Sequence, residues 1–132
     1  MSRKLHLRIR KGRFAVCRLA PQEPVPSWAL TTGEFTSVSR TRDELSIVCA
    51  EDGVPSGIQC APGWRILRVE GPLDFAQTGI LASLAAPLAD AGVSIFAIST
   101  YDTDYVLVEE QQLDSAVRAL RAAGHTVEQY VG

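Results

Sequence analysis

The chain has 132 residues, of which 46% are apolar and 21% are charged, a composition typical of a globular protein that buries one or two small cores. A net charge of −2 gives no overall attraction to nucleic acid or to an anionic membrane, and no apolar run approaches the roughly 18 residues needed to span a bilayer. The three cysteines have no C-x-x-C spacing, which indicates free, buried thiols in a reducing compartment and favours a soluble cytoplasmic protein.

The first half of the chain alternates short strand patterns with turns. Apolar and polar residues alternate from Leu5 to Arg10, which is the period of a half-buried strand. A Lys-Gly turn and a second strand pattern follow, so residues 5–19 are predicted to form a hairpin. The proline-rich connection after it has at most a short helix near Trp28. Residues 35–40 and 45–50 are a predicted strand pair, and residues 51–63 are a predicted loop.

The second half has stronger signals. Strands are predicted at residues 64–71, 93–100, 104–109 and 125–131, and helices at 78–92 and 110–124. Gly92 and Gly124 are predicted helix ends, and Pro87 should kink or shorten the first helix because it lacks a backbone donor. The order βαββαβ with right-handed crossovers predicts an α+β, ferredoxin-like fold: a four-stranded antiparallel sheet with both helices on one face.

A faint internal repeat relates the two halves. When residues 35–49 are laid over residues 95–109 without gaps, Ser39 matches Ser99 and Val48 matches Val108. Both segments have strand, polar turn and strand in the same order. We therefore expect two related modules, a degenerate one at residues 1–63 and a complete one at residues 64–132.

Metal and catalytic signatures are weak. Asp102 and Asp104 resemble the opening of a calcium loop, but the glycine and the closing bidentate Glu of such a loop are missing. The sequence has no nucleophile elbow or phosphate loop, and its histidines show no ligand spacing. His6 is predicted to be an exposed strand residue and His125 a residue at a helix end. We therefore expect no metal site, no cofactor and no catalysis.

One segment is suited to a small ligand. A strand runs into a loop and then into a helix that starts near Thr78 and Gly79, where free backbone N–H groups favour a carboxylate. The polar hairpin at Ser99, Thr100, Asp102 and Asp104 offers oxygens for hydroxyl or ammonium groups if it meets such a helix start, within the chain or across modules. The alternative is that Thr78 only caps the helix and the acids only keep the hairpin soluble.

The N-terminus is the one hint of nucleic acid. Six of the thirteen basic residues lie in the first thirteen positions, and a ferredoxin-like sheet can bind RNA when aromatic side chains on its central strands stack bases. The predicted central strands lack paired aromatic residues, so a solvated strand face is the favoured reading and RNA binding the alternative.

The segment from Gly79 to His125 resembles the ACT domain, a βαββαβ regulatory module that binds amino acids. The block "GVSIFAISTYDTDYVLV" is especially similar to small tandem ACT-like proteins related to aspartate kinase regulatory domains and to the animal cytosolic arginine sensor. Residues 35–55 resemble the hairpin of the preceding, degenerate module in the same proteins.

This resemblance implies a non-catalytic sensor that binds an amino acid at an interface between ACT modules, within the chain and across a homodimer. Carried over by motif, the ligand-binding residues would be Gln77, Thr78, Gly79, Ile80, Ser99, Thr100, Tyr101 and Asp104, with Asp43, Glu44, Leu45 and Ser46 of the first module as weaker candidates.

Overall fold

The computed structural model describes residues 4–30, 35–71 and 78–129. Contacts divide the chain into two compact units. Residues 1–10 and 65–132 form the first, which we call the split unit, and residues 11–64 form the second, which we call the inserted unit.

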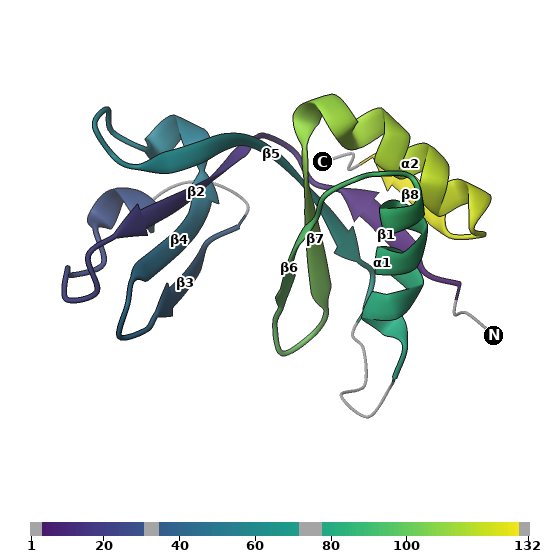
Figure 1. Ribbon diagram of the computed structural model, residues 1–132, viewed down its shortest axis with the longest axis horizontal. Coiled ribbons are helices and arrows are strands. Elements are labelled where there is room, and N and C mark those ends of the chain that lie inside the picture. The colour runs from purple at the N-terminus through teal and green to yellow at the C-terminus, as the bar shows by residue number, and fades with distance from the viewer. Residues whose placement is uncertain (1–3, 31–34, 72–77, 130–132) are drawn as a thin grey trace. The chain divides into compact units, whose positions relative to one another are not determined.

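The split unit contains two helices and five strands (Figure 1). Its elements are β1 (His6–Ile9), the second half of β5 (Cys60–Val69), α1 (Ile80–Asp90), β6 (Phe96–Ser99), β7 (Asp104–Glu109), α2 (Leu113–Ala122) and β8 (Thr126–Gln129), with a short 3-10 turn, η3 (Glu110–Gln112), before α2. The strand order is β6-β7-β5-β1-β8.

The N-terminal strand is the main departure from the predicted topology. β1 pairs antiparallel with β5, where Leu7 faces Val69, and parallel with β8, where Leu7 faces Val127. The predicted hairpin of residues 5–19 is therefore wrong, because β1 and the following strand belong to different units. The sheet is also mixed and five-stranded, where the sequence predicted four antiparallel strands: β1 lies between the first and last strands of the βαββαβ order.

Both helices cover the same face of this sheet, as predicted. Alternate residues of four strands point into one core with the apolar sides of the two helices. Its buried members are Leu7, Ile9, Leu67, Val69, Leu84, Leu88, Val93, Val106, Val108, Ala116, Leu120 and Val127.

Helix α1 continues through Pro87 instead of ending there, so the proline does not shorten it as one alternative predicted. A proline at position 87 leaves the carbonyl of Ser83 without its helical donor. His125 supplies a replacement, since its Nε2 lies 3.0 Å from the Ser83 oxygen and its Nδ1 lies 3.0 Å from the backbone nitrogen of Leu5. An N–H donor on Leu5 requires Nδ1 to be the acceptor, so Nε2 carries the hydrogen. His125 is buried, at 4% exposure, and connects Leu5, the residue before β1, to α1, so it is not the simple helix-end residue we predicted.

The inserted unit is a four-stranded sheet in the order β3-β4-β2-β5. Its elements are β2 (Phe14–Leu19), η1 (Ser27–Ala29), β3 (Ser37–Arg40), β4 (Leu45–Ala50), η2 (Glu51–Gly53) and the first half of β5. The helical turn near Trp28 is confirmed. The predicted loop of residues 51–63 is wrong at its end, because β5 begins at Cys60 and pairs with β2. Leu45, Ile47 and Cys49 line the core with Cys17.

The internal repeat is real in structure but offset by one residue from the predicted alignment. β6 begins 59 residues after β3 and β7 begins 59 residues after β4, with equal strand lengths in the two hairpins. Val38 faces Ile47 in one hairpin, and Ala97 faces Val106 in the other. The identities that suggested the repeat, Ser39 with Ser99 and Val48 with Val108, are therefore not structurally equivalent.

Candidate functional site

The turn between β6 and β7 is closed by its own hydroxyl groups. The backbone nitrogen of Thr100 donates to the carbonyl of Thr103 at 2.8 Å, and the Thr100 hydroxyl donates to the same oxygen at 3.1 Å. The Ser99 hydroxyl donates to Oδ1 of Asp104 at 2.6 Å. Tyr101 lies at the tip and is 81% exposed. The carboxylate of Asp104 is thus oriented by Ser99 and keeps its second oxygen as a further acceptor.

Thr103 attaches this turn to the strand that leads to α1. Its side chain is buried, at 3% exposure, and its hydroxyl donates to the carbonyl of Val69 at 2.6 Å. Val69 is the last residue of β5. The turn and the start of α1 consequently lie at the same end of the split unit (Figure 1). Sequence reasoning passed over Thr103 because its burial depends on contact with a strand 34 residues away.

Gly79 opens α1 in a conformation that favours glycine. Gly79 is the N-cap residue of α1, and its φ is +79°. Because glycine has no side chain, no side-chain hydrogen bond caps the helix. The Gly79 carbonyl accepts a 2.5 Å hydrogen bond from the Ser83 hydroxyl. Thr78 and Gly79 are exposed, whereas Ile80 is buried. Thr78 therefore is not the N-cap, and Gln77 lies outside the described residues.

The weaker candidates lie in the hairpin of the inserted unit. The backbone nitrogens of Asp43 and Glu44 donate to the hydroxyl of Thr41 at 3.1 and 3.2 Å, and Arg18 donates to the carbonyl of Asp43 at 2.9 Å. Leu45 is fully buried in the core, so its side chain is not available to a ligand. Glu44 and Ser46 line a pocket of about 270 Å³ within this unit.

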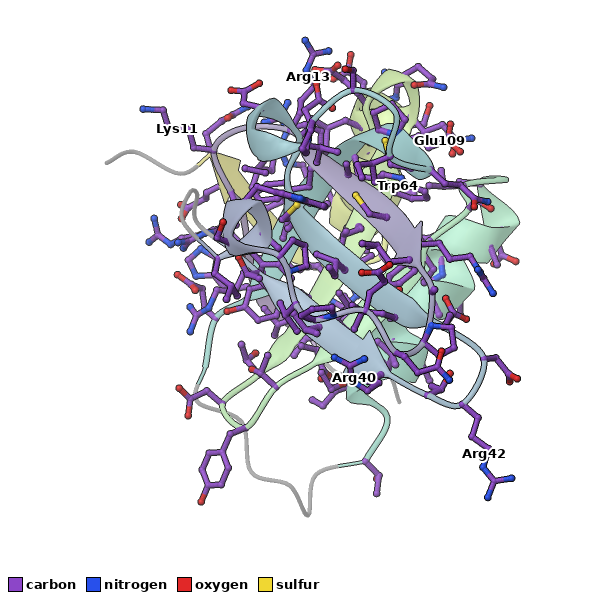
Figure 2. All side chains as sticks on the ribbon, turned by 90° about the vertical axis from the view of Figure 1, so that its left-hand side faces the viewer. Lys11, Arg13, Arg40, Arg42, Trp64 and Glu109 are labelled. Carbon is purple, nitrogen blue, oxygen red and sulfur yellow. The ribbon has the colours of Figure 1, made fainter. Side chains whose placement is uncertain are left out.

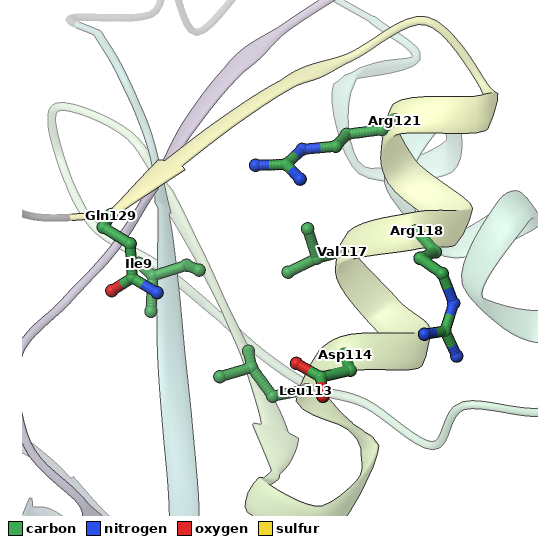
Figure 3. A pocket seen from close by; sticks show the side chains of 7 residues that line it. All are labelled: Ile9, Leu113, Asp114, Val117, Arg118, Arg121 and Gln129. Carbon is green, nitrogen blue, oxygen red and sulfur yellow. The ribbon is translucent and has the colours of Figure 1, made fainter.

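A second pocket, of about 230 Å³, lies in the split unit beside α2. Figure 3 shows Val117 and Arg121 reaching from α2 toward the strand that carries Gln129, while Arg118 points away from it. The guanidinium of Arg121 donates to the carbonyl of Val127 at 2.7 Å. Sequence reasoning missed this pocket, although Asp114, Arg118 and Arg121 have the spacing of one helical face.

The basic N-terminal strand faces acids of its own unit. Nε of Arg8 lies 2.5 Å from Glu70, and Nε2 of His6 lies 2.7 Å from Glu128. Glu70 also contacts Arg68 at 2.5 Å, and Arg68 donates to the hydroxyl of Tyr105 at 3.3 Å. Burial alone would lower the pKa of Arg68, but Tyr105 and Glu70 together raise it, so this cation is held firmly in its charged form.

Other basic side chains are dispersed. In the inserted unit, Figure 2 shows Lys11 and Arg13 at one end and Arg40 and Arg42 at the other. Arg13 lies 3.6 Å from Glu51, and Arg40 donates to the carbonyl of Pro21. Phosphate binding needs cations free to replace counterions, and the pairs made by Arg8, Arg13 and Arg68 do not support the RNA-binding alternative.

Among residues 4–30, 35–71 and 78–129, no cluster of His, Cys, Asp and Glu has the arrangement of a metal site. Within the same residues, no helix is both long and apolar enough to cross a membrane.

The comparison with known families agrees with the fold. The ACT domain family matches residues 59–122, and a second family, described as an N-terminal domain, matches residues 12–57. Residues 59–122 are therefore an ACT domain. This ACT domain protein has the tandem α+β fold of aspartate kinase regulatory domains: the regulatory subunit of aspartate kinase from Thermus thermophilus matches with a TM-score of 0.62 at 13% identity, covering 87% of this chain and 94% of that one.

Two further relatives are similar in sequence. A protein of Agrobacterium tumefaciens known from a crystal structure is 37% identical, with a TM-score of 0.92 over 99% of this chain and 97% of that chain. The human protein named cytosolic arginine sensor for mTORC1 subunit 1 is 42% identical over 59 residues, which are 44% of this chain and 18% of the sensor. The ACT domain protein thus matches less than a fifth of the length of that curated relative.

Proposed function

We propose that this ACT domain protein is a non-catalytic regulatory module that binds an amino acid in the split unit, between the start of α1 and the turn that joins β6 to β7. Family membership supports a regulatory role. The matched relatives are named as an arginine sensor and as a regulatory subunit, and these names motivate an amino acid as the ligand class here.

The observation that carries the proposal is the 2.6 Å hydrogen bond from Thr103 to Val69. This bond holds the polar turn at the end of the sheet where α1 begins. An amino acid has a carboxylate and an ammonium group, and these need opposite partners. The backbone N–H groups of the first turn of α1, which follows Gly79, suit the carboxylate, and Asp104, oriented by Ser99, suits the ammonium group.

We further propose that the chain forms a homodimer. Light scattering of the purified chain, with and without ligand, measures the oligomeric state. A monomer in both conditions would exclude the homodimer and leave the site in the split unit as it is proposed.

The first experiment is a thermal-shift screen of the twenty amino acids at millimolar concentration, followed by calorimetric titration of any hit. A ligand at 100 times its Kd stabilises the folded state by about 2.7 kcal/mol, which raises the unfolding temperature by several degrees. If none of the twenty raises the unfolding temperature, the proposed function is wrong.

Three substitutions locate the site. Asp104→Asn keeps an acceptor for Ser99 but removes the negative charge, so we expect at least a tenfold loss of affinity. Asp90→Asn, at the exposed far end of α1, is the matched control and should bind normally. Arg118→Gln tests the pocket beside α2. If Arg118→Gln abolishes binding and Asp104→Asn binds fully, the ligand binds in the pocket beside α2 and the proposed site is wrong.

A further inference from the structure

The three cysteines, which are far apart in sequence, lie together in the inserted unit. Cys17 on β2 faces Cys60 on β5 directly, and Cys49 on β4 faces Ala15, two residues before Cys17. Because directly opposed residues of an antiparallel pair share a face of the sheet, all three thiols are on one face. Cys17 and Cys49 are buried, and Cys60 is exposed, which corrects the prediction of three buried thiols.

The hydrogen-bond pattern shows how close the Cα atoms of Cys17 and Cys60 are. The backbone nitrogen of Arg18 donates to the carbonyl of Gln59 at 2.9 Å, so Arg18 and Gln59 are a hydrogen-bonded pair and the adjacent Cys17 and Cys60 are a non-hydrogen-bonded pair. In such a pair the Cα atoms are about 4.5 Å apart, at the short end of the range that a disulfide spans.

A small molecule can approach this pair. Cys60 is exposed, so a reactant in solution reaches its thiol without opening the core.

We propose that Cys17 and Cys60 form a reversible disulfide when the chain meets a low-molecular-weight disulfide such as oxidised glutathione, with the exposed Cys60 reacting first. Cys60 first loses its proton, its thiolate attacks one glutathione sulfur, and the glutathione disulfide bond breaks. One glutathione leaves as its thiolate and takes up the proton that Cys60 released. The Cys17 sulfur then attacks the Cys60 sulfur, and the second glutathione leaves with the proton of Cys17. Two protein thiols are oxidised and one glutathione disulfide is reduced to two thiols.

The environment of Cys17 explains the order of the two steps. Burial, with contributions from Cys49 and Cys60, raises the pKa of Cys17 to about 12. The buried thiol stays protonated near neutral pH and does not start the reaction. The closing step should accelerate with pH, by up to about tenfold per unit below pH 12, because its rate depends on the fraction of thiolate.

The test is incubation of the full chain in reduced and in oxidised glutathione buffers, followed by acid quenching, unfolding and alkylation. We expect the number of free thiols to fall from three to one in the oxidised buffer and to return to three in the reduced buffer. Digestion with trypsin and a glutamate-specific protease separates Cys49 from Cys60 by cutting after Glu51. A cross-linked peptide pair containing Cys17 and Cys60 is the expected product.

Two variants make the result specific. Cys49→Ala should form the same cross-link, and Cys60→Ser, which changes an exposed side chain, should abolish it. Three outcomes would overturn the proposal: three thiols that stay free, a stable mixed disulfide on Cys60 with no cross-link, or a bond between Cys17 and Cys49.

Discussion

At the scale of single residues, Thr103 joins the β6–β7 turn to the end of β5 by one buried hydrogen bond. A hydroxyl buried against the carbonyl of Val69 positions a whole turn, and the carbonyl would lose this donor in an isosteric apolar variant. Burial makes the loss costly, since an unsatisfied buried acceptor costs about 1–3 kcal/mol.

We therefore predict that Thr103→Val lowers the free energy of unfolding by about 1–3 kcal/mol in urea denaturation. If the proposed ligand site is correct, ligand affinity should fall as well, because the turn is no longer held beside α1. Thr126→Val, at an exposed position of β8, should change stability by less than about 0.5 kcal/mol. Equal effects of the two variants would show that the Thr103 hydroxyl has no special role.

At the scale of elements, α1 depends on a residue from outside the helix. Pro87 removes the donor that the Ser83 carbonyl would normally receive, and His125 replaces it. The proline and the histidine should therefore be energetically coupled, although they are 38 residues apart in the chain.

A double-mutant cycle measures this coupling. His125→Phe keeps a ring in the space but leaves the Ser83 carbonyl and the Leu5 nitrogen unpaired, so it should cost about 2–4 kcal/mol. In a Pro87→Ala background the helix pairs the Ser83 carbonyl itself, and we predict that the same change costs about 1 kcal/mol less. Urea denaturation of the four proteins gives the coupling energy, and strictly additive effects would contradict this account of α1.

These elements also show what the sequence can and cannot predict. The positions of both helices and of the strands before and after them follow from local apolar periodicity and from Gly92 and Gly124. The partner of β1 does not, because alternation identifies a strand and its buried face but not its neighbour. The Lys-Gly turn after Arg10 satisfies every local requirement of a hairpin, and only long-range pairing with β5 and β8 excludes it.

In the candidate site, too, some residues could be predicted from the sequence and others could not. Gly79, Ser99 and Asp104 could be predicted as candidates because polar groups at turns and helix starts have local signatures. Thr103 and His125 were not, because their roles depend on burial by residues more than 30 positions away.

At the scale of the whole molecule, the inserted unit interrupts an otherwise continuous domain. β1 and β5 are adjacent and antiparallel, and the backbone nitrogen of Arg10 donates to the carbonyl of Ile66 at 2.8 Å. A two-residue hairpin turn can connect a hydrogen-bonded pair such as Arg10 and Ile66.

We predict that replacing residues 11–65 by Asn-Gly gives a chain that folds by itself. The core of the split unit lies within the retained residues, so circular dichroism and thermal unfolding should show a cooperative transition. The matched control begins at Ile66 and lacks β1, which leaves β5 and β8 without their shared neighbour, and it should not fold cooperatively. An unfolded Asn-Gly chain would mean that the split unit needs the inserted unit for stability.

The position of β1 has a consequence for synthesis on the ribosome. β1 is made long before its parallel neighbour β8: Leu5 and His125, which bond to each other, are 120 residues apart. At about 5–20 residues per second, β1 waits about 6–24 s for β8. The inserted unit, whose residues are all made by position 64, can fold within that interval. β1 is thus made early but enclosed late, and its apolar side chains are open to chaperones until β8 has been made.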